Sequence, residues 1–206
     1  MRSLIVALLV ILTSGPALAY EEPAHTVELE DGRFEVRTYE PMIIASVIVN
    51  AEGRRASSLG FRPLADYIFG NNTAKAEIEM TAPVTQREVS QKIDMTVPVL
   101  QAGSSPGQTM VAFVMPSEWT MASLPTPNNS DVEISEVPSR RVVSYRFYGS
   151  GTDKQQTIAT EILGGWMDMN DLVPIGEPIF NFYSGPWIPG PLRKNEVHFE
   201  IARPES

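Results

Sequence analysis

The stretch that decides the fold is Ile78-Glu79-Met80-Thr81-Ala82-Pro83-Val84, which returns fifteen positions later as Ile93-Asp94-Met95-Thr96-Val97-Pro98-Val99. In both copies the apolar residues recur at every second position, so they share one face of an extended chain. Each proline belongs to the opposite set, where a missing N–H suits an edge strand or a bulge. We therefore predict two strands, and the short polar linker 85–92 lets them return antiparallel.

This doublet resembles the signature of the SOUL haem-binding protein family, and further motifs of that family follow in the expected order over nearly all of the chain after residue 30. The matching motifs are Gly60-Phe61, Tyr67-Ile68-Phe69-Gly70, Phe113-Val114-Met115-Pro116-Ser117, Leu124-Pro125, Gly185-Pro186-Trp187 and Arg193-Lys194-Asn195-Glu196-Val197. The resemblance implies a distorted antiparallel β-barrel flanked by two helices. It also implies haem or another porphyrin as a non-covalently bound cofactor.

Two segments of the chain share one plan at a constant offset of 98 residues. Each segment starts with a pair of apolar strands, such as 34–39 and 42–49, which are joined at a proline and precede an amphipathic helix. A second pair of strand candidates follows each helix. The sequence therefore predicts an α+β fold of duplicated β-β-α-β-β halves, about 34–116 and 131–203, within one domain spanning 20–206.

Each predicted helix has a single apolar face. The face of the first, between Arg54 and Phe69, comprises Phe61, Leu64, Ala65 and Ile68. Pro63 either kinks this helix or marks its first turn. In the second, Thr152 and Gln155 have the spacing of a capping box. The segment 101–108, rich in Gly, Ser and Pro, is expected to be a loop.

The chain begins with the features of a secretory signal peptide. Met1-Arg2 precedes nine apolar residues, and the small-residue triplet Ala17-Leu18-Ala19 follows a helix-breaking Gly-Pro pair. The apolar run is too short to cross a hydrocarbon layer of about 30 Å. We expect cleavage after Ala19 and a periplasmic or secreted protein without a membrane span, an uncleaved anchor being the alternative. The first ten residues from Tyr20 would form an exposed lead-in, and ordered structure would begin near Phe34.

The composition excludes several classes of function. The formal net charge is −9, and it becomes −10 when Arg2 leaves with the signal peptide. An acidic chain without a basic run opposes binding to the phosphates of nucleic acid. Because the chain has no cysteine and only two histidines, thiolate catalysis, disulfides and clustered nitrogen or sulfur metal sites are not expected.

The resemblance places the porphyrin-facing side of the first helix at Leu59, Arg62, Pro63, Asp66 and Tyr67. An oily wall with one cation at its rim suits a flat apolar ring that carries carboxylates, and Arg62 could pair with a propionate. The alternative for each residue is ordinary packing or a solvated charge. Thr38 stands where some family members carry a proposed haem-ligating histidine, so we expect weak or absent axial ligation, with His198 a remaining candidate.

Three functions follow as hypotheses. The leading one is an exported haem- or tetrapyrrole-binding protein that holds the porphyrin in a shallow apolar groove for buffering, scavenging or transfer. The second is a tetrapyrrole-modifying, dechelatase-like enzyme, in which Asp66, Tyr67 or Glu77 would supply protons. The third is a general small-ligand or partner-binding module, because one fold hosts many functions. An open groove would also allow a homodimer, although no sequence feature specifies one.

Overall fold

The computed structural model of the protein describes residues 22–74, 92–93, 98–185 and 187–203. The predicted doublet lies outside these residues except for Lys92, Ile93 and the stretch from Pro98 onward. In chain order the elements are β1 (His25–Asp31), β2 (Phe34–Tyr39), β3 (Met42–Val49), α1 (Gly53–Ile68), β4 (Asn72–Thr73), β5 (Val99–Ser105), β6 (Gln108–Val114), β7 (Thr126–Pro127), β8 (Glu133–Val137), β9 (Arg140–Tyr148), α2 (Asp153–Met169), β10 (Pro174–Phe182), the short 3-10 helix η1 (Gly190–Leu192) and β11 (Lys194–Ile201).

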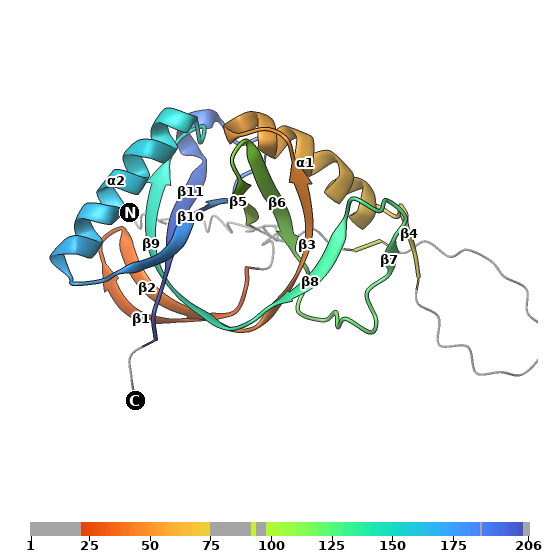
Figure 1. The fold of residues 1–206 in the computed structure, drawn as a ribbon, viewed down its shortest axis with the longest axis horizontal. Coiled ribbons are helices and arrows are strands. Elements are labelled where there is room, and N and C mark those ends of the chain that lie inside the picture. Colours follow the sequence, from red (N-terminus) through yellow and green to blue (C-terminus); the bar gives the residue numbers. More distant parts are fainter. Residues whose placement is uncertain (1–21, 75–91, 94–97, 186, 204–206) are drawn as a thin grey trace, which may run out of the picture.

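The described strands form one large antiparallel sheet of nine strands in the order β1-β2-β9-β11-β10-β5-β6-β3-β8, beside a small ribbon of β4 and β7. The sheet curves strongly, and both helices lie on its outer, convex side (Figure 1). Its end strands β1 and β8 do not pair with each other among the described residues. The α+β class is therefore confirmed, whereas closure of the sheet into a barrel is not.

Apart from the two-residue strand β4, the element order β-β-α-β-β occurs twice, from β2 to β6 and from β8 to β11. The first strand of each repeat pairs with the other repeat, since β2 lies beside β9 and β8 lies beside β3. The two repeats are joined again where β10 pairs with β5. This exchange of strands interlocks the repeats within a single sheet, so neither can bury its strands alone.

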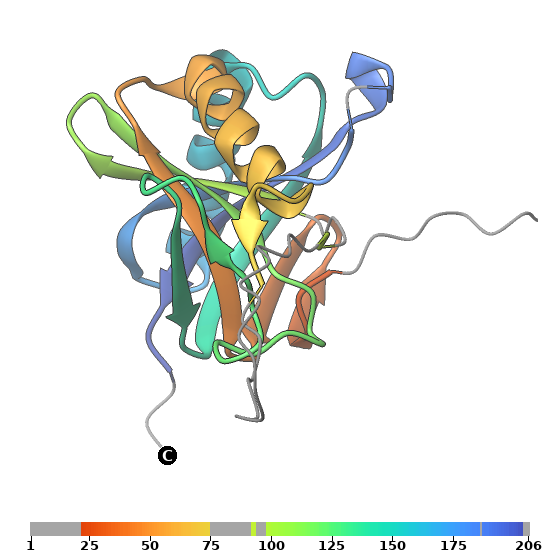
Figure 2. The ribbon, with the colours of Figure 1, turned by 90° about the vertical axis from the view of Figure 1, so that its right-hand side faces the viewer.

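Helix α1 covers the outer side of β3 and β6, as the view in Figure 2 shows. Its buried face is Ala56, Gly60, Leu64, Tyr67 and Ile68. A Cβ on Gly60 would lie 2.5 Å from the Val111 Cβ, so only glycine allows this close approach. Pro63 lies well inside a helix that begins at Gly53 and does not mark its first turn. Phe61, predicted on the core face, is 40% exposed.

Helix α2 begins with the predicted capping box. The Thr152 side chain accepts a bond from the Gln155 backbone N–H, and the Gln155 side chain accepts one from Thr152. The helix packs Leu163, Trp166 and Met167 onto the outer faces of β9 and β11. Within the described part of the chain, neither helix combines the length and apolar character that crossing a bilayer requires.

Two sequence predictions are wrong. The expected lead-in contains the strand β1, which pairs with β2 from His25 opposite Tyr39 to Asp31 opposite Phe34. Its side chains are nearly all exposed, and only Val27 and Leu29 give it an apolar alternation. The expected loop 101–108 mostly continues β5 and β6, because backbone ladder bonds form there whatever the side chains are.

Candidate functional site

Four of the five predicted ligand-facing residues lie together on the exposed surface of α1. Leu59, Arg62 and Asp66 are exposed and Pro63 is half-buried, and their spacing of three and four residues places them along one flank of the helix. Just beyond the helix, Phe69 is 59% exposed and extends the apolar surface. We call Leu59, Arg62, Pro63, Asp66 and Phe69 the α1 strip.

Tyr67 is turned away from the α1 strip into the core. Its side chain is almost fully buried, and its hydroxyl donates a hydrogen bond of 2.9 Å to the Pro125 carbonyl oxygen. Burial raises the pKa of the Tyr67 hydroxyl to about 12. Tyr67 therefore holds the segment around Pro125 against the helix and does not present its ring to a ligand on the strip.

The α1 strip has the chemistry of a shallow binding surface. Leu59, Pro63 and Phe69 supply apolar area, and Arg62 forms no ion pair with any described residue, so its guanidinium is available to a ligand carboxylate. Asp66 accepts a hydrogen bond of 2.6 Å from the Asn71 side chain, which fixes the carboxylate beside the helix end. A flat apolar ring with acidic substituents matches this surface.

His198 lies in a different region of the molecule. It is on the inner face of β11, whereas α1 packs on the outer face of β3 and β6. Its side chain is buried, and its Nε2 lies 2.9 Å from the Glu196 carboxylate. Burial lowers the pKa of the imidazole despite Glu196, so the neutral ring donates from Nε2. A ligand on the α1 strip therefore cannot be ligated by His198.

Glu196 is the centre of a buried ionic network on the inner side of β2, β9 and β11. Arg37 donates two hydrogen bonds to it, of 2.8 and 3.2 Å, and a third of 2.6 Å to Glu35. Arg146 also bonds Glu35, and the Tyr183 hydroxyl donates to Glu196 at 2.9 Å. We call Glu35, Arg37, Arg146, Glu196 and His198 the charged region.

The charged region keeps its acids ionised. Burial alone would raise the pKa of Glu196, but the hydrogen bonds from His198 and Arg37, together with the charge of Arg37, outweigh burial and hold that pKa well below its usual range. Burial is likewise outweighed at Glu35 by the hydrogen bond and charge of Arg37, and its pKa is lowered. Because every partner is supplied by the protein, the network acts as an internal support of the sheet.

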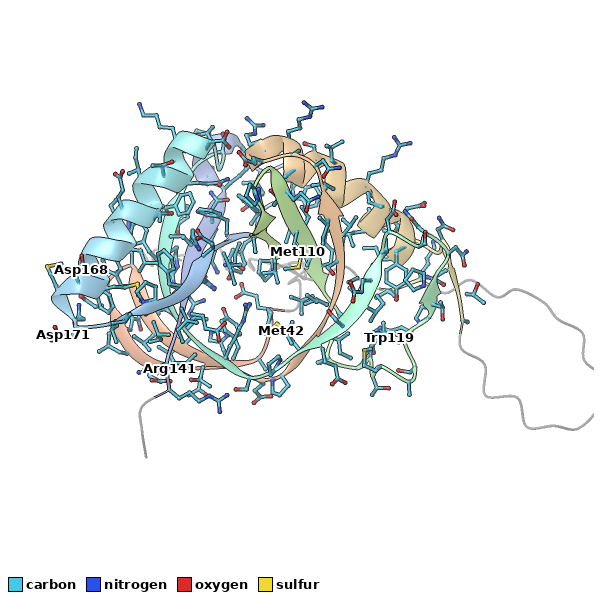
Figure 3. All side chains as sticks on the ribbon, in the orientation of Figure 1. Met42, Met110, Trp119, Arg141, Asp168 and Asp171 are labelled. Carbon is cyan, nitrogen blue, oxygen red and sulfur yellow. The ribbon has the colours of Figure 1, made fainter. Side chains whose placement is uncertain are left out.

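The other half of the inner face is apolar. Ile44, Leu100, Ala112 and Val114 from β3, β5 and β6 form a buried cluster, which we call the apolar region. Met42 packs against it, and Figure 3 shows Met42 and Met110 inside the curve of the sheet, far from Asp168 and Asp171 at the outer end of α2. One curved sheet thus has two chemically different inner surfaces.

No metal site is found among the described residues, because nowhere there do three or more His, Asp or Glu side chains gather in a suitable way. The Thr38 hydroxyl, at the position of the family's proposed ligand, donates to Glu28 at 2.6 Å. Met80 and Met95, considered as thioether ligands, and Glu77 lie outside the described residues.

Spacing along the sequence could not have revealed the charged region. Glu35 and Arg37, like Glu196 and His198, alternate with apolar neighbours, which is the pattern of a strand with one solvated face. Arg37 and Glu196 are 159 residues apart and meet only because β9 lies between β2 and β11. The signal that the sequence does carry is that these four ionisable residues occur on strands flanked by large apolar residues.

A curved antiparallel sheet with two helices on its convex side and an exposed apolar strip on one of them defines the class: an α+β protein built from two interlocked repeats. Solved structures share this architecture. The C-terminal domain of EcmrR superimposes with a TM-score of 0.58 at 11% identity, over 82% of this chain and 97% of that domain. A hydrolase from Listeria innocua gives 0.52 at 13% identity, over 85% and 94%. At such identities the likeness concerns the fold alone.

Within this class, the chain belongs to the SOUL heme-binding protein family, whose model matches residues 20–200. The resemblance inferred from the sequence motifs is thereby confirmed. The chain is also 29% identical over 140 residues to Heme-binding protein 2 of Mus musculus. That alignment covers 65% of this chain and 62% of the mouse protein. Membership supports haem or another tetrapyrrole as the ligand.

Proposed function

We propose that this protein holds haem or a related porphyrin against the α1 strip, non-covalently and with weak or no axial ligation, and serves to buffer, scavenge or transfer it. The observation that carries the proposal is that Leu59 and the half-buried Pro63 lie beside Arg62 on the helix surface. The Arg62 guanidinium forms no ion pair with the described residues. The apolar residues would contact the ring face, and Arg62 would meet a propionate at its edge.

We further propose that the protein does this work after export, in the periplasm or outside the cell. The motif ending at Ala19 supports a cleaved signal peptide. Expression of the full chain in a bacterium with a Sec pathway should yield a secreted or periplasmic product whose intact mass corresponds to an N-terminal Tyr20. A product that keeps residues 1–19 and sediments with membranes would contradict the proposed export.

Carriage fits the site better than catalysis. Dechelation would require a proton donor near the ring, but the Tyr67 hydroxyl is bonded to Pro125 and its raised pKa makes it a weak acid. The Asp66 side chain is exposed, so the surface does not exclude water from its carboxyl group. Incubation with haemin followed by chromatography of the extracted pigment should return haemin unchanged, and conversion to metal-free porphyrin would favour the enzymatic alternative.

The decisive test is an absorbance titration with haemin and, in parallel, with metal-free protoporphyrin. We expect a saturable Soret shift with both ligands. Arg62→Ala should weaken binding on the order of threefold to tenfold, since it removes one exposed charge-assisted contact. Arg54→Ala is the matched control, because Arg54 is exposed on the same helix but lies outside the α1 strip. The proposal would be overturned if neither ligand bound to the unmodified protein, or if the two arginine variants weakened binding equally.

A further inference from the structure

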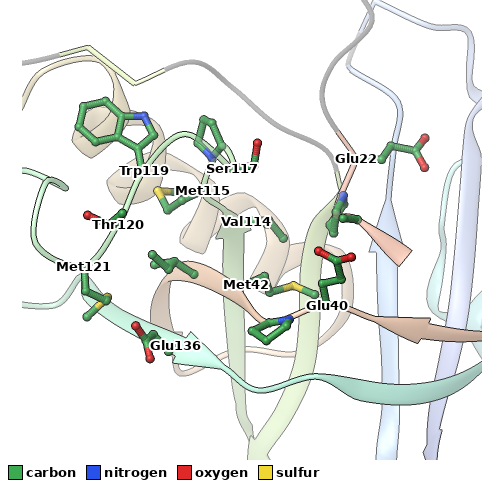
Figure 4. Close-up of a pocket in the computed structure, with 15 residues that line it drawn as sticks. Glu22, Glu40, Met42, Val114, Met115, Ser117, Trp119, Thr120, Met121 and Glu136 are labelled. Carbon is green, nitrogen blue, oxygen red and sulfur yellow. The ribbon is translucent and has the colours of Figure 1, made fainter. Parts of the chain in front are cut away.

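A second hollow lies at the rim of the sheet, where β3 begins and β6 ends. It encloses about 430 Å³ and is completed by the residues before β1 and by the loop that follows β6. This volume is typical of sites for small organic molecules. None of its lining residues belongs to α1, so the hollow is separate from the α1 strip. We call it the rim cavity (Figure 4).

The wall of the rim cavity is rich in soft, polarisable side chains. Met42, Met115 and Met121 contribute three thioethers, and Trp119 contributes an indole. Trp119 and Glu22 lie at opposite ends of the lining in Figure 4, with Met115 and Met42 between them. Methionine adapts to irregular apolar shapes, and tryptophan is the side chain that attracts an organic cation most strongly to its face.

The charge of the lining has one sign. Glu22, Glu40 and Glu136 line the rim cavity, and no Lys, Arg or His is found among the described residues of the lining. Glu22 pairs with Lys194 at 3.3 Å, but Glu40 and Glu136 form no ion pair with the described residues. Two uncompensated carboxylates beside an apolar wall would repel an anion and attract a cation.

We propose that the rim cavity binds a small amphipathic organic cation, such as a quaternary ammonium or N-alkylpyridinium compound. The apolar part would rest against Trp119 and the methionines, and the positive nitrogen would lie toward Glu40 and Glu136. This is the opposite selectivity to the α1 strip, where Arg62 suits carboxylates. A porphyrin dicarboxylate is therefore excluded from the rim cavity, and the inference does not depend on the porphyrin proposal.

The test compares three probes of similar shape: 1-methyl-4-phenylpyridinium, neutral 4-methylbiphenyl and anionic biphenyl-4-carboxylate. Binding to the purified protein is followed by calorimetry and by tryptophan fluorescence, with Trp119→Phe identifying the contribution of the cavity. We expect saturable binding of the cation, at least about tenfold weaker binding of the neutral probe, and none of the anion. Equal binding of the cation and its neutral counterpart would overturn the proposal.

Charge-removing variants then locate the site. Glu40→Gln and Glu136→Gln should each weaken binding of the cation by roughly threefold to tenfold while leaving the affinity for the neutral probe unchanged. Glu133→Gln is the matched control, because Glu133 is exposed on the same strand as Glu136 but does not line the cavity. Saturating haemin should not displace the cation. Unchanged affinity in both lining variants, with folding verified by circular dichroism, would place the cation elsewhere and refute the assignment.

Discussion

The charged region and the apolar region share two pairs of corresponding strands, β9 with β3 and β11 with β6, yet they stabilise the sheet by different means. In the apolar region, the removal of Leu100 and its neighbours from water stabilises the fold, and this stabilisation depends little on pH or exact geometry. In the charged region, Glu196 has lost its hydration and depends on each hydrogen bond from Arg37 and His198. Duplication therefore preserves the strand order but leaves each inner surface free to diverge.

The outer surfaces differ in a related way. The helix outside the apolar half, α1, carries the exposed strip, and the rim cavity lies at the edge of the same half. The outer side of the charged half is covered by α2, whose Trp166 is buried and donates to Asp31 at 2.9 Å. We interpret the charged half as the rigid support and the apolar half as the one that offers surfaces to ligands.

The largest effect should come from Arg37→Ala, which removes the main partner of two buried carboxylates. Glu196 and Glu35 would remain buried without their bidentate and ionic contacts, so the free energy of unfolding should fall by about 3–5 kcal/mol. Urea denaturation measures this loss. Arg141→Ala is the control, because Arg141 pairs with Glu28 on the outer side of the sheet and should cost about 1 kcal/mol or less. Similar losses in both variants would show that the charged region is not the support.

The apolar region should respond to a change of volume. Leu100 is 6% exposed, and Leu100→Ala would leave a cavity between β5 and its neighbours, with a loss of about 2–4 kcal/mol. The same urea experiment gives the value. Since no charge is involved, raising the salt concentration should leave this loss unchanged. A marked salt dependence would mean that the two regions are coupled through the strands that join them.

Acid should distinguish the two regions. The pKa values of Glu196 and Glu35 are lowered in the folded state, so below about pH 4.5 the unfolded chain binds more protons and stability is lost. The lowered pKa of His198 acts in the same direction below about pH 6.5. Between pH 7 and pH 4 we expect a loss on the order of 1–3 kcal/mol. The free energy of unfolding of Leu100→Ala should fall with pH in parallel with that of the unmodified chain. A free energy of unfolding that does not change with pH in the unmodified chain would contradict the ionised state of the network.

The sequence predicted best those elements whose side chains alternate between core and solvent. The strands 34–39 and 42–49 were predicted with the bounds that β2 and β3 have. The strand β1 was missed because only Val27 and Leu29 mark its alternation, and an edge strand is held largely by backbone bonds that do not depend on the side chains. The helix predicted between Arg54 and Phe69 agrees with α1 to within one residue at each end, and of the two roles left open for Pro63 the first turn is excluded.

For the candidate site, the family resemblance implied that Leu59, Arg62, Pro63, Asp66 and Tyr67 share one side of the helix, but it could not show that Tyr67 faces Pro125. Tyr67 follows Pro63 by four residues, so helical spacing alone puts it at the edge of the same flank. Only the position of the chain at Pro125, which is 58 residues away, decides that the ring is core. Long-range pairing is the information that a local pattern lacks.

The smallest effect should come from the cap of α2, which secures the helix over the charged half. Thr152→Ala removes the oxygen that accepts the Gln155 N–H, and the cost should be about 1 kcal/mol. Thr157→Ala is the control, since Thr157 is exposed one turn later and bonds only the Asp153 carbonyl within the helix. By contrast, Glu52, the N-cap residue of α1, makes no capping hydrogen bond with its side chain. If the charged half is the rigid support, the loss at Thr152 should appear in global unfolding by urea, because α2 as a whole cannot leave the sheet without exposing Leu163 and Trp166. A loss confined to local hydrogen exchange near residue 155 would instead show that α2 opens on its own.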